Sequence, residues 1–391
     1  MYSGKRSSRG MGLRAADERS GRARIVISSF DNLDSAHYAG GGAAVVEQIA
    51  RWLAPTFDVT VVTASRRSAR LADGGVKYQR LAVGRLGPRA SQLLFHLRLP
   101  LAVRRIPHEL WIESFTPPFS TSFLPLFSKS RVLGFAQNLS GVEMWRRYRI
   151  PFFLIERIGL MFYRDVVVLN PVDGETIRRS KRPPAIHVIP NGVELPTIDD
   201  SRIGAEHILF LGRIDIWPKG LDLLLAAYEK SGLTTPLVIA GYGTASEEKR
   251  LKTMLATAPG DVRWIGRVAG DQKRELIEKC SMMVLPSRHE PFGLSALEAL
   301  GYSKPVVHFD LPSLTWIGPG GLPVERLNVS ALAEGMRTLM DDPLKYRELC
   351  RAARLQAERF TPDQMADRHI SLVKRLVSIG AISAGQDLGA E

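Results

Sequence analysis

Short β-branched apolar runs alternate with helical patterns along nearly the whole chain, and this alternation restricts the possible folds more than any other feature. Its first instance is a run at Arg24–Phe30, a helical pattern at Gly42–Leu53 and a second run at Asp58–Ala64. A strand, a glycine-rich turn, a helix and a strand form a βαβ unit. Such units build parallel sheets that helices cover on both faces. The pattern therefore predicts an α/β fold.

The alternation runs in two series. In the first, further strands are predicted at Val76–Val83, Leu110–Phe115, Arg131–Gln137, Val166–Asn170 and Ile186–Pro190. The segment Glu194–Ser201 then lacks apolar periodicity and is typical of a linker. In the second series, strands are predicted at His207–Arg213, Pro236–Gly241, Val262–Gly266, Ser281–Pro286 and Pro305–Phe309. A chain of 391 residues is long enough for two cores, because single cores stop growing near ~250–300 residues.

These patterns predict a two-domain chain with short ends outside the domains. The expected parts are a basic disordered tail at 1–22, a first Rossmann-like domain at 23–195, a second at 196–360, a helix at 361–380 and a tail at 381–391. The basic tail has no apolar run behind it, so it is not typical of a secretory signal. Only Cys280 and Cys350 occur, which fits a reducing cytoplasm and gives no zinc or disulfide pattern.

The net charge of +13 belongs almost entirely to the first half of the chain. Residues 1–200 hold 29 Lys and Arg against 17 Asp and Glu. Within this half, residues 92–105 and 145–164 place arginines beside Leu, Phe, Ile and Tyr. That composition is found in helices that lie in a membrane interface, and also in ordinary core helices with charged ends. Both interpretations stay open, and the first predicts contact with an anionic membrane surface.

The loop GRIDIWPKG, at 212–220, follows the first strand of the second series and carries Arg213 and Lys219. Parallel sheets present ligands at the carboxyl ends of their strands. Arginine offers phosphate oxygens a planar fork and lysine a compact charge, so the two cations could grip a diphosphate. The order of residues is not that of a P-loop. Taken alone, such a loop is more often a solvated connection with two ordinary surface cations.

The segment RHEPFGLSALEAL, at 288–300, begins a helix around Phe292 and Gly293 and carries Glu290 and Glu298. The free N–H groups of a helix start favour an anion. Carboxylates beside such a site should accept hydrogen bonds from hydroxyl groups, which a nucleotide sugar supplies. The turn at Ala39–Gly42, AGGG, also lets the backbone approach a ligand at a helix start, or is simply a tight connection.

Together these motifs resemble glycosyltransferase family 4, whose members are retaining enzymes of the GT-B fold, including bacterial enzymes of polysaccharide biosynthesis. The resemblance rests on E-P-F-G-x-x-x-x-E, G-R-x-x-x-x-x-K-G, PNGVE before the linker and the glycine turn after the first strand. It implies two Rossmann-like domains that face each other across a cleft, an acceptor domain first and a donor domain second, with the last helix crossing back. It also implies transfer of a hexose from a nucleotide-diphosphate sugar to a glycan or lipid-linked acceptor, in polysaccharide or glycolipid synthesis.

The resemblance assigns roles to individual residues. The catalytic candidates are Arg213 and Lys219, which would bind the diphosphate, and Glu290, which would face the donor sugar. The donor-binding candidates are Gly40, Gly41, Gly42, Gly241, Phe292, Gly293, Leu294 and Glu298, the last of them binding the ribose. Gln137 and Asn138 are candidates for the acceptor or sugar side. Many members carry a histidine where Gln137 stands. The segment LPSLTWIGPGGLPVE also lacks the usual G-G-x-x-E order.

The family works without a divalent metal, and the chain contains no D-x-D motif to hold one. We therefore expect no metal and no cofactor. The expected location is the cytoplasm, with peripheral association at the inner face of the membrane.

Three other functions remain as alternatives. A nucleotide-sugar epimerase of the same fold would use the same diphosphate grip. A nucleic-acid-binding protein would explain the basic first half, although no RRM, KH or helix-turn-helix signature accompanies it, and nucleic acid is not an expected partner. A dehydrogenase is weaker, because GYGTAS has Ser246 where G-x-G-x-x-G needs its third glycine.

Overall fold

The computed structural model describes residues 21–30, 41–65, 69–83, 88–116, 121–139, 141–197 and 206–387. The chain divides into two compact units. Unit 1 comprises Met1–Val168, Asp173–Val188 and Ala366–Glu391, and unit 2 comprises Leu169–Val172 and Ile189–Met365. Each unit is built around one sheet, so the two are described separately.

The sheet of unit 1 has the strand order β3-β4-β2-β1-β5-β6-β7-β8. Its strands are β1 (Arg24–Ser29), β2 (Asp58–Ser65), β3 (Ala69–Asp73), β4 (Val76–Ala82), β5 (Leu110–Ser114), β6 (Arg131–Ala136), β7 (Asp165–Val168) and β8 (Ala185–Val188). Neighbouring strands pair in parallel except β3, which pairs antiparallel with β4. The central strands β1 and β5 are buried over nearly their full length, as expected of apolar runs covered on both faces.

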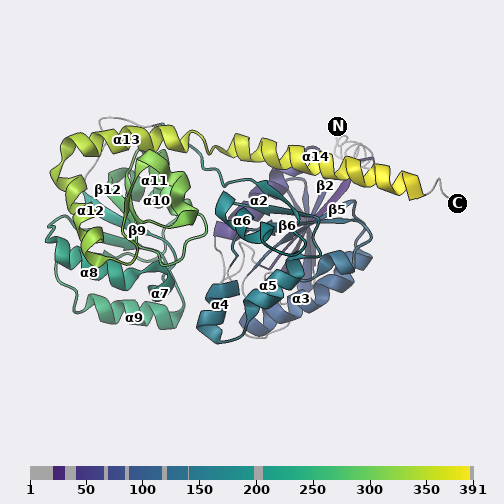
Figure 1. The fold of residues 1–391 in the computed structure, drawn as a ribbon, viewed down its shortest axis with the longest axis horizontal. Helices are drawn as coiled ribbons and strands as arrows, with labels where there is room; N and C mark the ends of the chain where they lie inside the picture. The colour runs from purple at the N-terminus through teal and green to yellow at the C-terminus, as the bar shows by residue number, and fades with distance from the viewer. Residues whose placement is uncertain are drawn as a thin grey trace, which may run out of the picture. The chain divides into compact units, whose positions relative to one another are not determined.

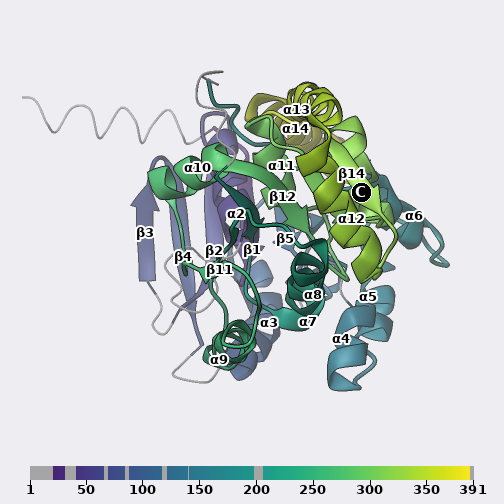
Figure 2. The same cartoon turned by 90° about the vertical axis from the view of Figure 1, so that its left-hand side faces the viewer.

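Helices lie on both sides of this sheet. They are α2 (Gly41–Leu53), α3 (Pro88–Arg105), the 3-10 turn η1 (Leu124–Leu126), α4 (Gly141–Tyr148), α5 (Phe152–Leu160) and α6 (Pro171–Arg178). In both Figure 1 and Figure 2, α3, α4 and α5 gather on one side of the unit, and α14 (Pro362–Asp387) runs along the opposite side. The core beneath α3 and α5 contains Phe95, Leu99, Trp111 and Leu160.

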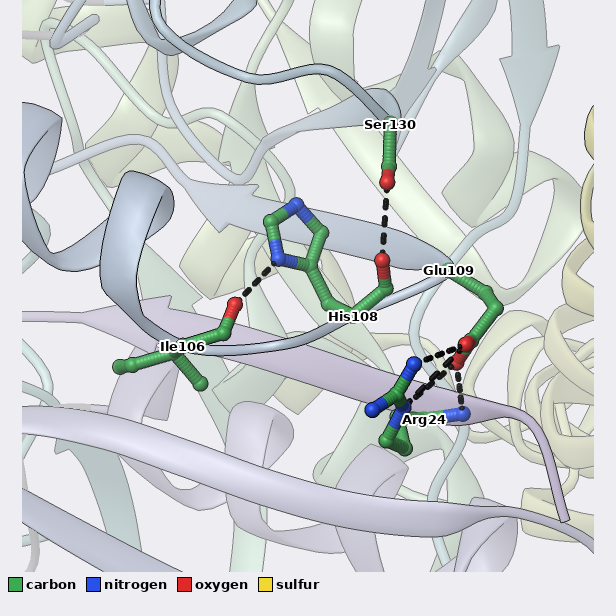
Figure 3. Close-up of polar contacts among 5 residues, drawn as sticks. All are labelled: Arg24, Ile106, His108, Glu109 and Ser130. Carbon is green, nitrogen blue, oxygen red and sulfur yellow. Dashed lines mark hydrogen bonds and ion pairs between the residues drawn. The ribbon is translucent and has the colours of Figure 1, made fainter.

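A polar cluster joins the amino ends of β1, β5 and β6 in unit 1 (Figure 3). The guanidinium of Arg24, the first residue of β1, donates to Glu109 at 2.6 Å, and its backbone N–H donates to the same carboxylate. Ser130, just before β6, donates to the backbone oxygen of His108 at 2.8 Å. His108 in turn contacts the Ile106 carbonyl at 2.7 Å. Ligands of parallel sheets bind at the opposite, carboxyl edge, so we interpret this cluster as structural.

The sheet of unit 2 has the order β11-β10-β9-β12-β13-β14, with every pairing parallel. Its strands are β9 (His207–Leu211), β10 (Leu237–Ala240), β11 (Val262–Trp264), β12 (Cys280–Leu285), β13 (Val306–Phe309) and β14 (Gly321–Val324). Its helices are α7 (Ile216–Lys219), α8 (Leu221–Ser231), α9 (Ala245–Leu255), α10 (Gly270–Lys279), α11 (Leu294–Gly301), η3 (Pro312–Gly320), α12 (Val329–Asp341) and α13 (Pro343–Ala357).

Helix α14 starts in unit 2 and continues in unit 1 from Ala366. There the His369 ring packs edge-on against Phe135 of β6, with centroids 5.7 Å apart. Farther along, Arg375 lies 3.5 Å from a ring nitrogen of His187 in β8. These contacts confirm that the last helix crosses back to the first sheet.

The predicted α/β class with two parallel sheets is confirmed, and all twelve predicted strands occur at their predicted places. Three details differ. Strands β3 and β14 were not predicted, and the pairing of β3 is antiparallel. The segment 145–164 forms two helices, because Arg149 has φ 58° and Pro151 precedes α5. Helix α14 continues to Asp387, into residues expected as a tail, since no proline interrupts its alanine-containing end.

The domain boundaries stay a prediction, and residues 1–20 of the basic tail lie outside the described residues. No helix within the described part of the chain is both long and apolar enough to cross a bilayer.

Candidate functional site

The strand order of unit 2 marks where a ligand should bind. The chain proceeds from β9 outward to β10 and β11 on one side, and to β12, β13 and β14 on the other. Such a reversal is a topological switch point, and ligands of doubly wound sheets bind beside it at the carboxyl ends of the strands. The two loops at this point are 212–220, after β9, and 286–293, after β12. They are the two segments that the sequence singles out.

The first loop presents two cations. Arg213 is exposed and its side chain has no hydrogen-bond or ion-pair partner among the described residues. Lys219 ends the short helix α7, and Gly220 follows in the left-handed conformation, with φ 66°. A Cβ atom on Gly220 would lie 2.0 Å from the backbone oxygen of Pro286. The first loop therefore packs directly on the backbone of the second, and only glycine fits at this contact.

Lys219 and Glu290 join the two loops by an ion pair. The Lys219 ammonium donates to Oε2 of Glu290 at 2.7 Å, and the Ser287 hydroxyl donates to the same oxygen at 3.0 Å. The side chains are only 19% and 8% exposed. Burial alone would raise the pKa of Glu290, but the charge and hydrogen bond of Lys219 outweigh it, so its pKa lies below the ordinary value. Glu290 is therefore an ionised hydrogen-bond acceptor at neutral pH, and not a proton donor.

Arg288 holds the same two loops together, and no role was predicted for it. Its guanidinium donates to both carboxylate oxygens of Asp222 at 2.7 Å and to the backbone oxygen of Trp217 at 2.8 Å. It also lies over the Trp217 ring, 5.3 Å from the centroid, while its backbone N–H donates to Pro218. A two-pronged contact of this kind fixes geometry as well as adding energy. Arg288 thus positions the segment that carries Lys219.

Phe292 is anchored by an aromatic cluster that the sequence did not indicate. Its buried ring stacks on Trp316 with centroids 4.6 Å apart, and Phe360 packs edge-on against both rings. The Trp316 indole donates to the Phe292 backbone oxygen at 2.8 Å. Gly293 follows with φ 82° and caps α11. The Phe292 ring thus faces the interior, and the first N–H groups of α11 lack intrahelical acceptors, as at every helix start. This part of the site offers backbone donors.

Two predicted donor-binding residues have structural partners. Glu298 of α11 accepts from Lys273 of α10 at 2.7 Å, and its side chain is 26% exposed. Gly241 has φ 146°, and a Cβ there would lie 1.8 Å from the backbone oxygen of Gly212. Packing of β10 against the first loop therefore explains this glycine without a ligand. Binding of ribose by Glu298 and of the nucleotide by Gly241 stays a prediction.

In unit 1 the switch point lies between β1 and β5. Gln137, which follows β6, donates to the Ser114 hydroxyl at 2.9 Å and to the Gly42 backbone oxygen at 3.2 Å. A Cβ on Gly42 would lie 2.9 Å from the Gln137 amide oxygen. Gln137 thus ties the start of α2, at Gly41, to the end of β5. Asn138 is half-buried beside it, and Gly40 lies outside the described residues.

A buried polar network below this edge was also not predicted. Glu113 of β5 accepts from the Ser122 backbone N–H at 2.6 Å and from the Tyr163 hydroxyl. Burial raises the pKa of Glu113 to about 7, although these hydrogen bonds oppose the rise. His96 of α3 contacts the Ser122 hydroxyl at 2.5 Å, and burial lowers its pKa to about 4. The sequence signal, an acidic residue inside a β-strand, was present at Glu113 but is not specific.

Among the described residues, no three His, Cys, Asp or Glu side chains gather where they could hold a metal ion. The expectation that the chain works without a metal stays a prediction.

Comparisons with known proteins show which sequences and folds the chain resembles. The family model for glycosyl transferases group 1 matches residues 205–342, which contain both loops of unit 2. A glycogen synthase of Mycobacterium tuberculosis is 31% identical over 193 residues, which are 46% of this chain and 44% of that protein.

Two solved structures resemble nearly the whole fold. Sucrose-phosphate synthase from Thermosynechococcus elongatus has a TM-score of 0.78 at 21% identity, covering 92% of this chain and all of that one. HepE of Anabaena, solved with UDP-glucose, has a TM-score of 0.71 at 14% identity, with 90% and 100% covered. These similarities confirm the GT-B fold and a relation to GT-B glycosyltransferases. Membership of family 4 is compatible with them. The curated match spans less than half the length of its relative.

Proposed function

We propose, from the GT-B fold and the group 1 glycosyltransferase region of unit 2, that this chain transfers a glycosyl group from a nucleotide-diphosphate sugar to an acceptor hydroxyl. The observation that carries the proposal is the Lys219–Glu290 pair at the switch point of unit 2, with the exposed Arg213 on the same loop. It combines cations for a diphosphate with an ionised acceptor for sugar hydroxyls.

In this reaction Arg213 and Lys219 bind the diphosphate and stabilise the negative charge that develops as it leaves. Cations held in place before the reaction can do this without reorganisation. Glu290 accepts hydrogen bonds from hydroxyls of the donor sugar. Its Oε2 already receives Lys219 and Ser287, which supports a binding role over nucleophilic attack. The acceptor oxygen then bonds to the anomeric carbon from the face that the nucleotide leaves, while the bond from that carbon to the diphosphate oxygen breaks. The hydroxyl proton passes to the departing diphosphate, so configuration is retained without a divalent metal.

The remaining donor contacts follow the same arrangement. The backbone of Phe292, Gly293 and Leu294 supplies N–H donors to the sugar or phosphate, and Glu298 binds the ribose while Lys273 orients it. In unit 1, the glycines at the start of α2 and Gln137 with Asn138 serve the sugar or acceptor side. The UDP-glucose in HepE makes UDP and a hexose the first donor to test.

The acceptor is proposed to be a glycan or a lipid-linked glycan, in the synthesis of a cell-surface polysaccharide or glycolipid. Relatedness to glycogen synthase supports a growing glycan as acceptor. The proposed location is the cytoplasm, with peripheral contact to the inner face of the membrane through residues 92–105 and 145–164.

The test is a screen of nucleotide sugars by donor hydrolysis and transfer, followed by substitution of the two cations. Arg213→Ala should remove most activity while leaving thermal unfolding unchanged, because this side chain has no partner among the described residues. The matched controls are Lys249→Ala and Arg250→Ala, which remove neighbouring exposed cations on α9.

Lys219→Ala should abolish turnover as well. Near wild-type turnover of both loop variants, or epimer formation in place of transfer, contradicts the proposed function.

A further inference from the structure

Helix α3 exposes a row of leucines on the surface of unit 1. Leu93, Leu97 and Leu101 are 44%, 67% and 49% exposed. They are spaced four residues apart, so they lie along one side of the helix. The opposite side of α3 is buried, with Phe95 and Leu99 each 1% exposed. The helix is therefore anchored in the core through one apolar side and presents a second to the solvent.

Helix α5 repeats this arrangement. Leu154 and Ile158 are 45% and 47% exposed, and Phe162, four residues farther, is 39% exposed. Gly159 and Leu160 are buried on the inner side. A single exposed leucine needs no explanation, but two helices with the same repeat in one unit do.

The two rows belong to one surface, because η1 connects them. The Phe123 ring lies 6.1 Å from that of Phe162 at the end of α5. The guanidinium of Arg104, in the last turn of α3, lies 5.3 Å from the ring centroid of Phe127. Between these contacts Leu126 of η1 is 54% exposed. Figures 1 and 2 both have α3 and α5 on the same side of the unit. We call the exposed side of α3, η1 and α5 the apolar-basic face.

The charges on this face are positive. The exposed cations of these elements and their ends are Arg98, Arg104, Arg105, Arg149, Arg157 and Arg164. The acidic residue of α5, Glu156, is half-buried and accepts from the Gly141 backbone N–H at 3.2 Å. The apolar-basic face thus combines protruding aliphatic groups with arginines that no exposed carboxylate of α3, η1 or α5 neutralises.

We propose that the apolar-basic face docks in the interface of an anionic lipid bilayer, with the leucines and Ile158 among the acyl chains and the arginines at the headgroups. Charge complementarity selects this occupant, since arginines flanking aliphatic rows match anionic headgroups above hydrocarbon. A nucleic acid would match the charges but leave the aliphatic rows in water. Docking would hold unit 1 where lipid-linked acceptors are, but it does not depend on the donor chemistry of unit 2.

The structure also shows which residues of the segment 92–105 could take part in docking. Six of its fourteen residues belong to the core: Gln92, Phe95, His96, Leu99, Ala102 and Val103 are buried. Only the exposed row can enter a membrane, and this makes two separate variants possible. Leu97→Gln with Leu101→Gln and Ile158→Gln removes aliphatic groups, and Arg98→Gln with Arg105→Gln and Arg157→Gln removes charge. The matched control is Leu344→Gln with Leu355→Gln, exposed leucines of α13 that are 73% and 65% accessible.

The experiment is co-flotation of the full chain with phosphatidylcholine vesicles, with and without phosphatidylglycerol, at physiological salt. The wild type and the α13 control should float with the anionic vesicles. Each arginine near an anionic surface contributes about 1 kcal/mol, or roughly a fivefold change in binding, so the charge variant should bind roughly a hundredfold more weakly. Burying one such side chain completely contributes about 1.5–3 kcal/mol. At half that depth the three together contribute at least about 2 kcal/mol, so the aliphatic variant should bind at least roughly thirtyfold more weakly. Unchanged melting temperatures verify the folding of both.

Three outcomes overturn the proposal: no flotation of the wild type, equal flotation of the α13 control and the face variants, or binding to single-stranded nucleic acid in place of vesicles. Donor hydrolysis is measured in the same preparations without vesicles. Because the apolar-basic face contains none of the proposed donor-binding residues, the two results are separate. Absence of hydrolysis by the wild type contradicts the proposed function, whereas the flotation result alone decides the docking face.

Discussion

Gly220, which follows α7, allows a controlled test of the loop 212–220. Gly232 has the same left-handed backbone conformation but lacks the close contact that Gly220 makes. Gly220 has φ 66° and Gly232, at the other end of α8, has φ 63°. An alanine in this left-handed conformation costs about 1–2 kcal/mol. The restricted unfolded chain offsets about 0.4–1 kcal/mol of this. Gly232→Ala should therefore lower the free energy of unfolding by about 1 kcal/mol.

Gly220→Ala adds a steric clash to the same conformational cost. The new Cβ would lie 2.0 Å from the Pro286 oxygen, whereas nothing lies within 4 Å of a Cβ at Gly232. Restoring an ordinary separation of about 3.5 Å requires one loop to move by more than about 1 Å. Such overpacking costs about 1–3 kcal/mol, for a total loss of about 2–4 kcal/mol. Since Lys219 is the adjacent residue, the movement displaces it, and a shift of about 1 Å can lower a rate about 10²-fold.

The assay is urea unfolding together with the steady-state rate of donor turnover, for the wild type and both variants. We expect Gly232→Ala to keep its turnover and Gly220→Ala to lose most of it, with the larger loss of unfolding free energy at Gly220. Equal unfolding free energies and equal turnover in the two variants would refute the close packing of the two loops.

Three further predictions concern partners that are far apart in the sequence. In Arg288→Lys, the lysine cannot contact Asp222 and the Trp217 carbonyl together, so the variant should lower kcat/KM for the donor about tenfold or more. Asp222→Asn should have the same effect, and the double variant should be no worse than either single variant. Additive effects in this double-mutant cycle would contradict a shared role. Lys273→Ala should raise the donor KM with little change in kcat, since it orients Glu298, and an unchanged KM would remove Lys273 from the site. The pKa of Glu113 is raised by burial to about 7, so its stabilising contribution is complete below the unfolded value of 4.5 and is lost as the pH rises through about 7. Glu113→Gln, which keeps the neutral form, should melt above the wild type at pH 8 and near it at pH 4.5, and equal melting temperatures at pH 8 would contradict the raised pKa.

The sequence predicted most strands of both sheets because buried parallel strands consist of short, continuous apolar runs. Strands β3 and β14 were not predicted, because neither is a continuous apolar run. The first, ARLAD, is an edge strand in which Arg70 and Asp73 interrupt any apolar run, and the second, GLPV, contains a glycine and a proline that depress strand propensity. Both form because a neighbouring strand supplies hydrogen bonds, which no local pattern records.

Some residues of the candidate site could likewise be predicted from the sequence, and others could not. Arg213, Lys219 and Glu290 could be located, because the residue types and their places after strands carry the chemistry. The contacts that hold these residues in place could not be predicted. The stacking of Trp316 on Phe292 joins residues 24 positions apart, and the Arg288–Asp222 contact joins residues 66 positions apart. Only tertiary packing brings such pairs together, and Arg288 had no assigned role although it stands within the motif.

The Lys219–Glu290 pair couples the chemistry of the site to the stability of unit 2. Glu290 can stay ionised at 7% exposure because Lys219 neutralises it, and removing one partner of a buried pair leaves an uncompensated charge. Lys219→Ala should therefore destabilise the fold as well as stop turnover, unlike Arg213→Ala. Combining Lys219→Ala with Glu290→Gln removes both charges and should recover stability without recovering activity. Recovery of both would mean that neither residue touches the donor, and recovery of neither would mean that the pair is held by more than its mutual charge.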